Sequence, residues 1–280
     1  NAWCKYVETV VKRYKGKVAM WEIWNEPNLH ENSKYPDKYA NLLSKTVDVI
    51  KSVDEDAVII GFGASRIPLA YVESVMDDMQ EENKVGTLDY ISFHPYYENP
   101  DDAMPEILRL KALVEKYSDE ISLFQGECGC PAVLEWGHAL RYHEWSEYSQ
   151  AKWDLRRMAN DFSINIPSSI FTLVDLQYPN MQQSFGLVRM NLLKEPVYRR
   201  PAFYGVRNMC ALLKENYSPD GAVEYASNSA REIKTVAIKD ENGKRIGVML
   251  WFGDRIPDSS LERTPVDVTL KGVDFKEPVY

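Results

Sequence analysis

The sequence lacks several features that mark common classes of protein. Its 280 residues contain no run of 18 apolar residues and no cluster of basic residues, and its net charge is −9. A membrane span needs about 20 apolar residues, and nucleic-acid binding depends on basic side chains. Neither a membrane nor a nucleic acid is therefore expected as a partner.

Histidines are few, and glycine-rich nucleotide-binding loops are lacking. Of the four histidines, only His94 falls at the end of a predicted strand. A metal-dependent hydrolase, which needs clustered His and carboxylate ligands, is therefore disfavoured. No glycine-rich loop follows a predicted strand, which weakens the case for nucleotide binding. We expect no metal and no cofactor.

The four cysteines form no recognisable framework. Cys128 and Cys130 stand too close together for an easy disulfide, and no Cys-x-x-Cys pair offers a zinc site. Free thiols are expected, while a bridge between Cys4 and Cys210 stays open as an alternative. The redox compartment is therefore undecided, with a secreted or periplasmic location slightly favoured.

Two short segments carry most of the information in the chain. Residues 21–28 read Trp-Glu-Ile-Trp-Asn-Glu-Pro-Asn, and residues 123–129 read Leu-Phe-Gln-Gly-Glu-Cys-Gly. Each is an apolar strand that ends on a carboxylate, Glu26 in the first and Glu127 in the second. Two carboxyl groups on converging strand ends can hydrolyse a glycosidic bond, because one protonates the leaving oxygen while the other attacks or stabilises the sugar carbon.

Strands and helices alternate up to residue 213. Continuous apolar strands between amphipathic helices predict a parallel sheet covered by helices, either a (β/α)8 barrel or a doubly wound sheet. The carboxylates lie at the C-terminal ends of the strands, where barrel enzymes keep their sites. The predicted strands are 18–24, 57–62, 88–93, 121–124 and 169–176, and the helices are 3–14, 39–50, 69–79, 107–117, 146–163 and 201–213.

The pattern changes after residue 215. Short apolar strands are predicted at 233–238, 245–252 and 266–270, and Asp-Glu-Asn-Gly at 240–243 is a hairpin signal between the first two. We therefore expect two domains. Residues 1–215 would form the helix-covered sheet, and residues 216–280 a small, incomplete β-sandwich-like domain.

The segment Trp-Asn-Glu-Pro-Asn, residues 24–28, resembles the acid/base motif of clan A glycoside hydrolases, which ends barrel strand four. In that clan the nucleophile Glu ends strand seven, and Glu127 ends the third strand after that of Glu26. The resemblance implies an α/β fold, a (β/α)8 TIM barrel with strands four to eight present and a small all-β domain after it. It also implies a retaining double displacement with Glu26 as acid/base and Glu127 as nucleophile. The general organisation is similar to xylosidase and arabinofuranosidase families.

The resemblance suggests substrate contacts as well. Asn25 would hold the sugar 2-hydroxyl, and His94 and Tyr96 lie in a segment that resembles the strand-six region that orients the nucleophile. Strand eight lacks the Trp that many clan members place under the sugar. Trp136 or Trp145, in the loop after the second motif, would take its place. The implied substrate is an oligosaccharide or polysaccharide of plant or microbial origin.

Two further expectations concern completeness and activity. An apolar strand at residues 18–24 needs a neighbour on each side, because an open edge carries unpaired backbone groups. We expect a preceding N-terminal segment or a second chain to complete the barrel. The alternative to an enzyme is a catalytically inactive carbohydrate-binding barrel, which the presence of both Glu26 and Glu127 disfavours.

Overall fold

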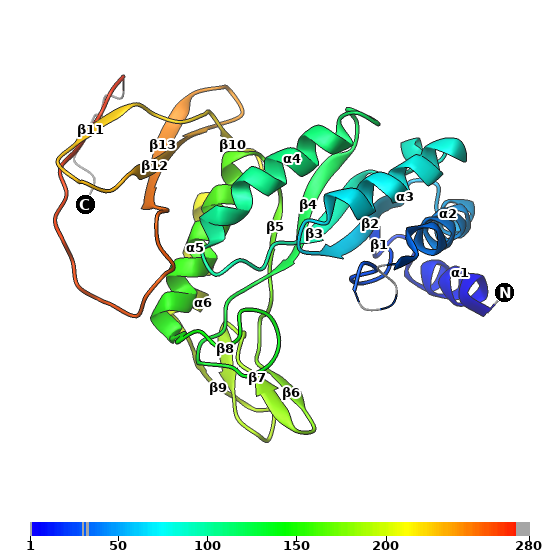
Figure 1. Cartoon of the computed structure of the whole chain (residues 1–280), viewed down its shortest axis with the longest axis horizontal. Helices are drawn as coiled ribbons and strands as arrows, with labels where there is room; N and C mark the ends of the chain where they lie inside the picture. Colours follow the sequence, from blue (N-terminus) through cyan, green and yellow to red (C-terminus); the bar gives the residue numbers. More distant parts are fainter. Residues whose placement is uncertain (1, 30, 32–33, 273–280) are drawn as a thin grey trace. The chain divides into compact units, whose positions relative to one another are not determined.

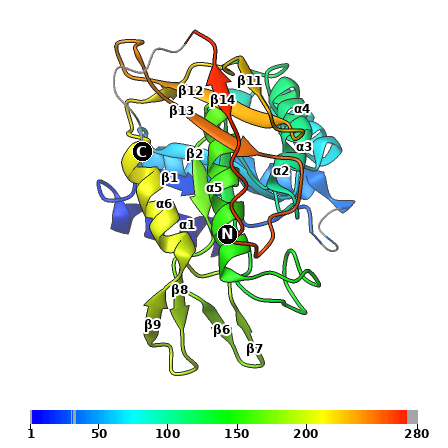
Figure 2. The same ribbon diagram turned by 90° about the vertical axis from the view of Figure 1, so that its left-hand side faces the viewer.

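A computed structural model of the chain describes residues 2–29, 31 and 34–272 (Figures 1 and 2). The helices are α1 (Ala2–Tyr14), α2 (Pro36–Val53), α3 (Leu69–Glu81), α4 (Met104–Val114), α5 (Glu147–Ser163) and α6 (Pro201–Leu212). Within the described part, no helix is both long and apolar enough to cross a membrane.

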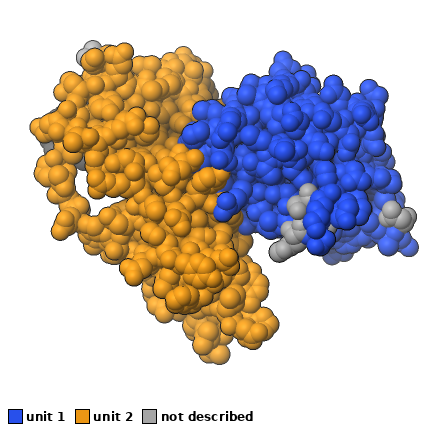
Figure 3. Space-filling model, viewed as in Figure 1, with its two compact units in different colours: residues 1–95, 103–128, 166–169 blue, residues 96–102, 129–165, 170–280 orange. Residues whose placement is uncertain are grey.

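The chain divides into two compact units, coloured separately in Figure 3. The first contains residues 1–95, 103–128 and 166–169, and the second contains residues 96–102, 129–165 and 170–280. This division differs in its bounds from the predicted one at residue 215, which stays a prediction.

A five-stranded sheet organises the first unit. Its strands are β1 (Met20–Glu22), β2 (Val58–Ser65), β3 (Tyr90–His94), β4 (Ser122–Cys128) and β5 (Ser168–Ile170), and they lie side by side in chain order. The pairs β1–β2, β2–β3 and β3–β4 are parallel. A doubly wound sheet would reverse its strand order at a switch point. The unbroken order is instead that of consecutive barrel strands.

Helices α1 to α4 pack on one another in the order α1–α2, α2–α3 and α3–α4. Their buried residues recur at helical spacing, as in Leu43, Val47 and Ile50 of α2, so each helix turns one apolar stripe inward. The strands beneath are apolar as well, with Ile59 and Ile91 fully buried. This core holds the strand ends in place.

Several predicted strands have different bounds in the structure. The expected strand 18–24 is reduced to β1, because Trp24 and Glu26 adopt positive φ angles that end the extended backbone. Strand β4 continues to Cys128, so Glu127 lies inside the strand instead of after it. The expected strand 169–176 is replaced by the short β5, and Leu176 begins a separate hairpin.

The second unit combines two helices with small antiparallel sheets. Helices α5 and α6 pack on each other, and Ser146 caps α5 through a reciprocal hydrogen-bonded pair with Ser149. The sheets consist of the pairs β6 (Leu176–Tyr178) with β7 (Met181–Gln183), β8 (Val188–Met190) with β9 (Pro196–Arg199) and β11 (Tyr225–Ser227) with β14 (Val268–Leu270), and of the three strands β10 (Ser218–Pro219), β12 (Ile233–Lys239) and β13 (Arg245–Phe252).

The predicted hairpin at residues 240–243 is confirmed. It joins the antiparallel strands β12 and β13. The Asp240 carboxylate accepts hydrogen bonds from the Asn242 and Lys244 amides at 3.0 and 2.9 Å, and Gly243 supplies the positive φ of 76° that the turn requires.

One acidic residue of the second unit is buried without hydrogen bonds to its carboxylate among the described residues. Asp154 of α5 is 1% exposed, and neither of its carboxylate oxygens has a hydrogen-bond partner among the described residues. Burial raises the pKa of this carboxyl well above its usual value of 3.8.

Candidate active site

The loop that carries Glu26 leaves the sheet at the end of β1. The Ile23 amide still donates to the Ile60 carbonyl at 2.9 Å, and the Glu26 amide donates to the Gly63 carbonyl at 2.8 Å. Between them, Trp24 has a φ of 71°, and Glu26 itself has a φ of 48°. Positive φ is uncommon outside glycine and concentrates at functional sites. The backbone therefore turns sharply at the predicted catalytic position.

Asn28 fixes the far side of this loop to the end of β2. Its side-chain oxygen accepts the Ser65 amide at 2.8 Å, and its side-chain nitrogen donates to the Ser65 carbonyl at 2.9 Å. The Tyr71 hydroxyl donates to the Pro27 carbonyl at 3.2 Å. These hydrogen bonds form a clamp that holds the motif against the end of β2 and helix α3. Asn28 is therefore a positioning residue that sequence reasoning missed, although it lies within the recognised motif.

A second clamp comes from helix α2. The buried Tyr39 hydroxyl donates to the Ile23 carbonyl at 2.9 Å and accepts the Phe62 amide at 2.6 Å. Burial raises the pKa of Tyr39, so its hydroxyl keeps its proton and can donate. In the sequence, Tyr39 is one member of an apolar helical stripe. Nothing there signals that its hydroxyl joins two strand ends.

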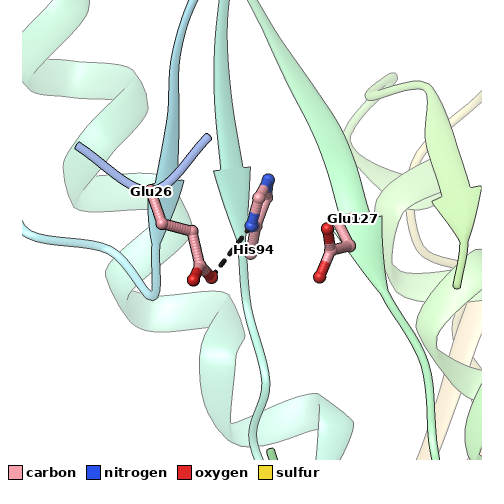
Figure 4. A group of neighbouring side chains, drawn as sticks. All are labelled: Glu26, His94 and Glu127. Carbon is pink, nitrogen blue, oxygen red and sulfur yellow. Dashed lines mark hydrogen bonds and ion pairs between the residues drawn. The ribbon is translucent and has the colours of Figure 1, made fainter. Parts of the chain in front are cut away.

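His94 is the last residue of β3 and is 1% exposed. Its backbone carbonyl accepts the Arg66 amide at 3.1 Å. Its ring nitrogen Nδ1 lies 3.1 Å from Glu26 Oε1, at hydrogen-bond distance (Figure 4). We expected His94 to orient the nucleophile Glu127. The hydrogen bond found is with Glu26, and a hydrogen bond to Glu127 stays a prediction.

Glu127 completes a cluster with Glu26 and His94. One oxygen of each carboxylate and one ring nitrogen all lie within 4.8 Å of one another (Figure 4). The three side chains come from β3, β4 and the loop after β1, so neighbouring parallel strands bring them to one edge of the sheet. The two carboxyl groups identified from the sequence therefore lie close together in space.

The strand positions below the cluster leave no room for larger side chains. A Cβ atom at Gly126 would lie 2.1 Å from Ser92 Oγ and 3.0 Å from Glu22 Oε1. Glu22 Oε1 would also lie 3.2 Å from a Cβ atom at Gly63. The absence of side chains at Gly63 and Gly126 thus makes space for the Glu22 carboxylate. Glu22 and Ser92 are further residues near the site that the sequence did not single out for it.

The other predicted substrate-binding residues have separate surroundings. Asn25 is exposed beside Glu26. Tyr96 belongs to the second unit and packs edge-on against Phe185, with ring centroids 6.3 Å apart. Trp136, also in the second unit, is 73% exposed and contacts the Tyr142 ring. The roles of these three residues stay predictions.

Two sequence-based alternatives can be corrected or decided. Trp145 is buried and its indole nitrogen donates to the Leu140 carbonyl at 2.7 Å, so it offers no exposed platform for a sugar. No disulfide joins any of the four cysteines, so the alternative bridge between Cys4 and Cys210 is not formed.

The order of the five strands is that of part of a TIM barrel, the fold found in clan A glycoside hydrolases. Comparison with known proteins supports the same class. Residues 1–125 match the family model described as Glycosyl hydrolases family 39. The resemblance to clan A glycoside hydrolases inferred from the motifs is therefore confirmed, and the family 39 model covers residues 1–125 of the 280.

Solved structures with a similar fold include two family 39 proteins. A family 39 glycoside hydrolase from Bacteroides cellulosilyticus WH2 has a TM-score of 0.67 at 22% identity, over 89% of this chain and 50% of that one. A family 39 β-xylosidase from Caulobacter crescentus has a TM-score of 0.56 at 17% identity, over 84% and 58%. These identities establish similarity of fold.

One curated sequence relative is named for a different sugar. Mannan endo-1,4-beta-mannosidase A of Emericella nidulans is 35% identical over 99 residues, which are 34% of this chain and 25% of that protein. The chain thus spans a quarter of this curated relative and about half the length of the similar solved structures.

Proposed function

We propose that the protein is a retaining glycoside hydrolase that cleaves glycosidic bonds in a plant- or microbe-derived glycan. The observation that carries the proposal is the separation of Glu26 and Glu127, whose nearest candidate ligand oxygens lie within 4.8 Å. Retaining enzymes hold their two carboxyl groups about 5–5.5 Å apart, whereas inverting enzymes need about 6.5–9.5 Å to admit a water molecule. The short separation favours retention.

The proposed reaction has two displacements. Glu127 attacks the anomeric carbon while Glu26 gives its proton to the leaving oxygen, which breaks the glycosidic bond and leaves a glycosyl ester on Glu127. Glu26 then takes a proton from water, and the resulting hydroxide equivalent displaces Glu127. Net retention follows because the anomeric carbon is inverted twice.

The other residues have proposed positioning roles. The hydrogen bond between His94 and Glu26 supports a role for the imidazole in orienting the acid/base carboxyl. Asn25 is proposed to contact the sugar 2-hydroxyl, and Tyr96 and Trp136 are proposed to bind substrate. The names of the relatives, a β-xylosidase and a β-mannosidase, make β-linked xylosides and mannosides the first substrates to test.

Two variants test the assignment of roles on aryl glycosides. Glu127→Ala should abolish turnover, and azide should restore it with an inverted glycosyl azide as product, because the anion occupies the vacated nucleophile position. Glu26→Ala should spare substrates with good leaving groups, which need little protonation. Near-normal turnover by Glu127→Ala would remove it as the nucleophile. Binding of glycans without turnover of any substrate would favour an inactive carbohydrate-binding barrel.

The edge of the sheet supports a second part of the proposal. Within the described residues β1 has a neighbour on one side only, and the nearby Val18, Met20 and Trp24 are 36%, 42% and 46% exposed. Apolar side chains at an open edge favour pairing with another strand. We therefore include a preceding segment or second chain that adds barrel strands beside β1, with residues 1–215 as the C-terminal part of the barrel and 216–280 as an accessory β domain.

Solution association tests this part independently of activity. The 280-residue chain should self-associate and bind a hydrophobic dye, and Met20→Lys should reduce both, because a charge at the edge opposes pairing. Leu108→Lys is the matched control, since Leu108 is exposed on helix α4. A chain that stays monomeric and binds no dye would count against additional strands at β1.

A further inference from the structure

The cluster of Glu26, His94 and Glu127 has the composition of a metal site. It presents one imidazole nitrogen and two carboxylate oxygens, all within 4.8 Å of one another (Figure 4). Zn²⁺ binds these donor types in proteins, commonly with three protein ligands and a water or substrate in the fourth position. The cluster therefore matches an open zinc site in ligand type and number.

Coordination of one ion by these three side chains requires only small movements of their ligand atoms. Two ligands that each lie about 2.1 Å from a tetrahedral ion are about 3.4 Å apart. His94 Nδ1 and Glu26 Oε1 are already 3.1 Å apart. A third oxygen within 4.8 Å reaches the ion by a shift of roughly 1.4 Å at most, which rotation of a carboxylate side chain can supply.

The backbone at each of the three ligands is also fixed, by hydrogen bonds or by its place in a strand. His94 is buried at the end of β3, with its carbonyl bonded to the Arg66 amide. The Glu26 amide is bonded to the Gly63 carbonyl, and Glu127 lies within β4. Binding to ligands that are already positioned costs less conformational entropy than binding to mobile side chains.

We propose that Glu26, His94 and Glu127 bind Zn²⁺ and that the bound ion inhibits the enzyme. Metal binding itself does not depend on the reaction assigned above. Inhibition rests on the proposed function, because the ion would engage the acid/base and the nucleophile together. The site thus takes a divalent cation of intermediate softness in competition with the glycan.

Calorimetric titration of the full chain with Zn²⁺ is the direct test. It is done in a Cys4→Ser, Cys210→Ser background, because Cys4 is partly exposed and Cys210 exposed, and such thiols bind zinc. We expect one equivalent of Zn²⁺ to bind, with affinity reduced at least about tenfold in Glu26→Gln, His94→Gln and Glu127→Gln. His143→Gln is the matched control and should leave the affinity unchanged.

Circular dichroism establishes that each variant is folded. If His94→Gln does not fold, the two Glu→Gln variants decide the result. The absorption spectrum of Co²⁺ in the same background reports nitrogen and oxygen coordination directly and should change in the same variants. Zn²⁺ affinity that persists in folded Glu26→Gln and Glu127→Gln would overturn the proposed site.

The inhibitory effect is measured separately on turnover of an aryl glycoside. Zn²⁺ should lower activity with the same midpoint as in calorimetry, and a chelator should restore it. Activity that is unaffected at saturating Zn²⁺, or that requires the ion, would overturn inhibition. If no glycoside is turned over, the proposed function fails, while calorimetry still decides whether these three residues bind metal.

Discussion

Replacing Gly126 by alanine tests how tightly the strands below the cluster are packed. The added Cβ would lie 2.1 Å from Ser92 Oγ on β3 and 3.0 Å from Glu22 Oε1. Since non-bonded carbon and oxygen atoms do not approach to 2.1 Å, Ser92 or one of the strands must move. Glu22 can yield more easily, because the atom in contact is the end of a flexible side chain.

The expected cost follows from this overlap. Overpacking by one methyl group typically destabilises a core by about 1–3 kcal/mol, so Gly126→Ala should lower the free energy of unfolding by that amount. Ser92 Oγ is buried without a hydrogen-bond partner among the described residues. Its removal in Ser92→Ala should therefore be close to neutral. The double variant should recover most of the loss, because the nearest obstacle has gone.

Urea unfolding of the two single variants and the double variant measures this coupling as a double-mutant cycle. Gly86→Ala is the control, because a Cβ there has no atom within 4 Å. If the proposed function holds, Gly126→Ala should also lower kcat, since Gly126 precedes Glu127. A stable Gly126→Ala variant, or a loss that Ser92→Ala does not relieve, would refute the packing argument.

Three further changes address the clamps and the buried acid. Asn28→Ala should cost about 1–3 kcal/mol in urea unfolding and lower kcat, because both hydrogen bonds to Ser65 are lost; an unchanged kcat would argue against the clamp. Tyr39→Phe should destabilise by a similar amount by leaving the Phe62 amide unpaired, and normal stability would show that the amide finds another acceptor. For Asp154, the raised pKa means that the folded chain keeps a proton that the unfolded chain loses, so stability should fall by up to about 1.4 kcal/mol per pH unit as the pH rises from about 3.8 through the folded pKa. Asp154→Asn should remove this slope in urea unfolding as the pH rises above about 3.8, and a slope that persists would assign it to another group.

The long periodic segments were predictable from the sequence. Helices α1, α2, α3 and α5 lie within a few residues of their expected bounds, because each repeats apolar residues at helical spacing over several turns. The end of β1 was not predictable. Trp24 continues the apolar run, and only its positive φ shows that the strand has ended. The hairpins between residues 176 and 199 were missed because their strands are three or four residues long.

The candidate site shows the same contrast. Glu26 and Glu127 could be paired in advance, because both lie at the C-terminal ends of predicted parallel strands. These ends meet at one edge of the sheet. The clamp from Tyr39 could not, since its partners Ile23 and Phe62 are neighbours only after β1 and β2 have paired. A hydroxyl that joins two backbones leaves no short motif in the sequence, whereas a carboxylate at the end of an apolar strand does.

The proposed catalytic residues and two of the proposed substrate-binding residues belong to different compact units. Glu26, His94 and Glu127 all belong to the first compact unit, so their mutual geometry depends on the packing of β1 to β4 and on the clamps at their ends. Tyr96 and Trp136, proposed for substrate binding, belong to the second unit. Changes at the clamps are therefore expected to act on kcat, because they alter the geometry of the proposed reacting groups. Changes at the exposed ring of Trp136 are expected to act on KM, because they remove contact area without disturbing the carboxyl pair.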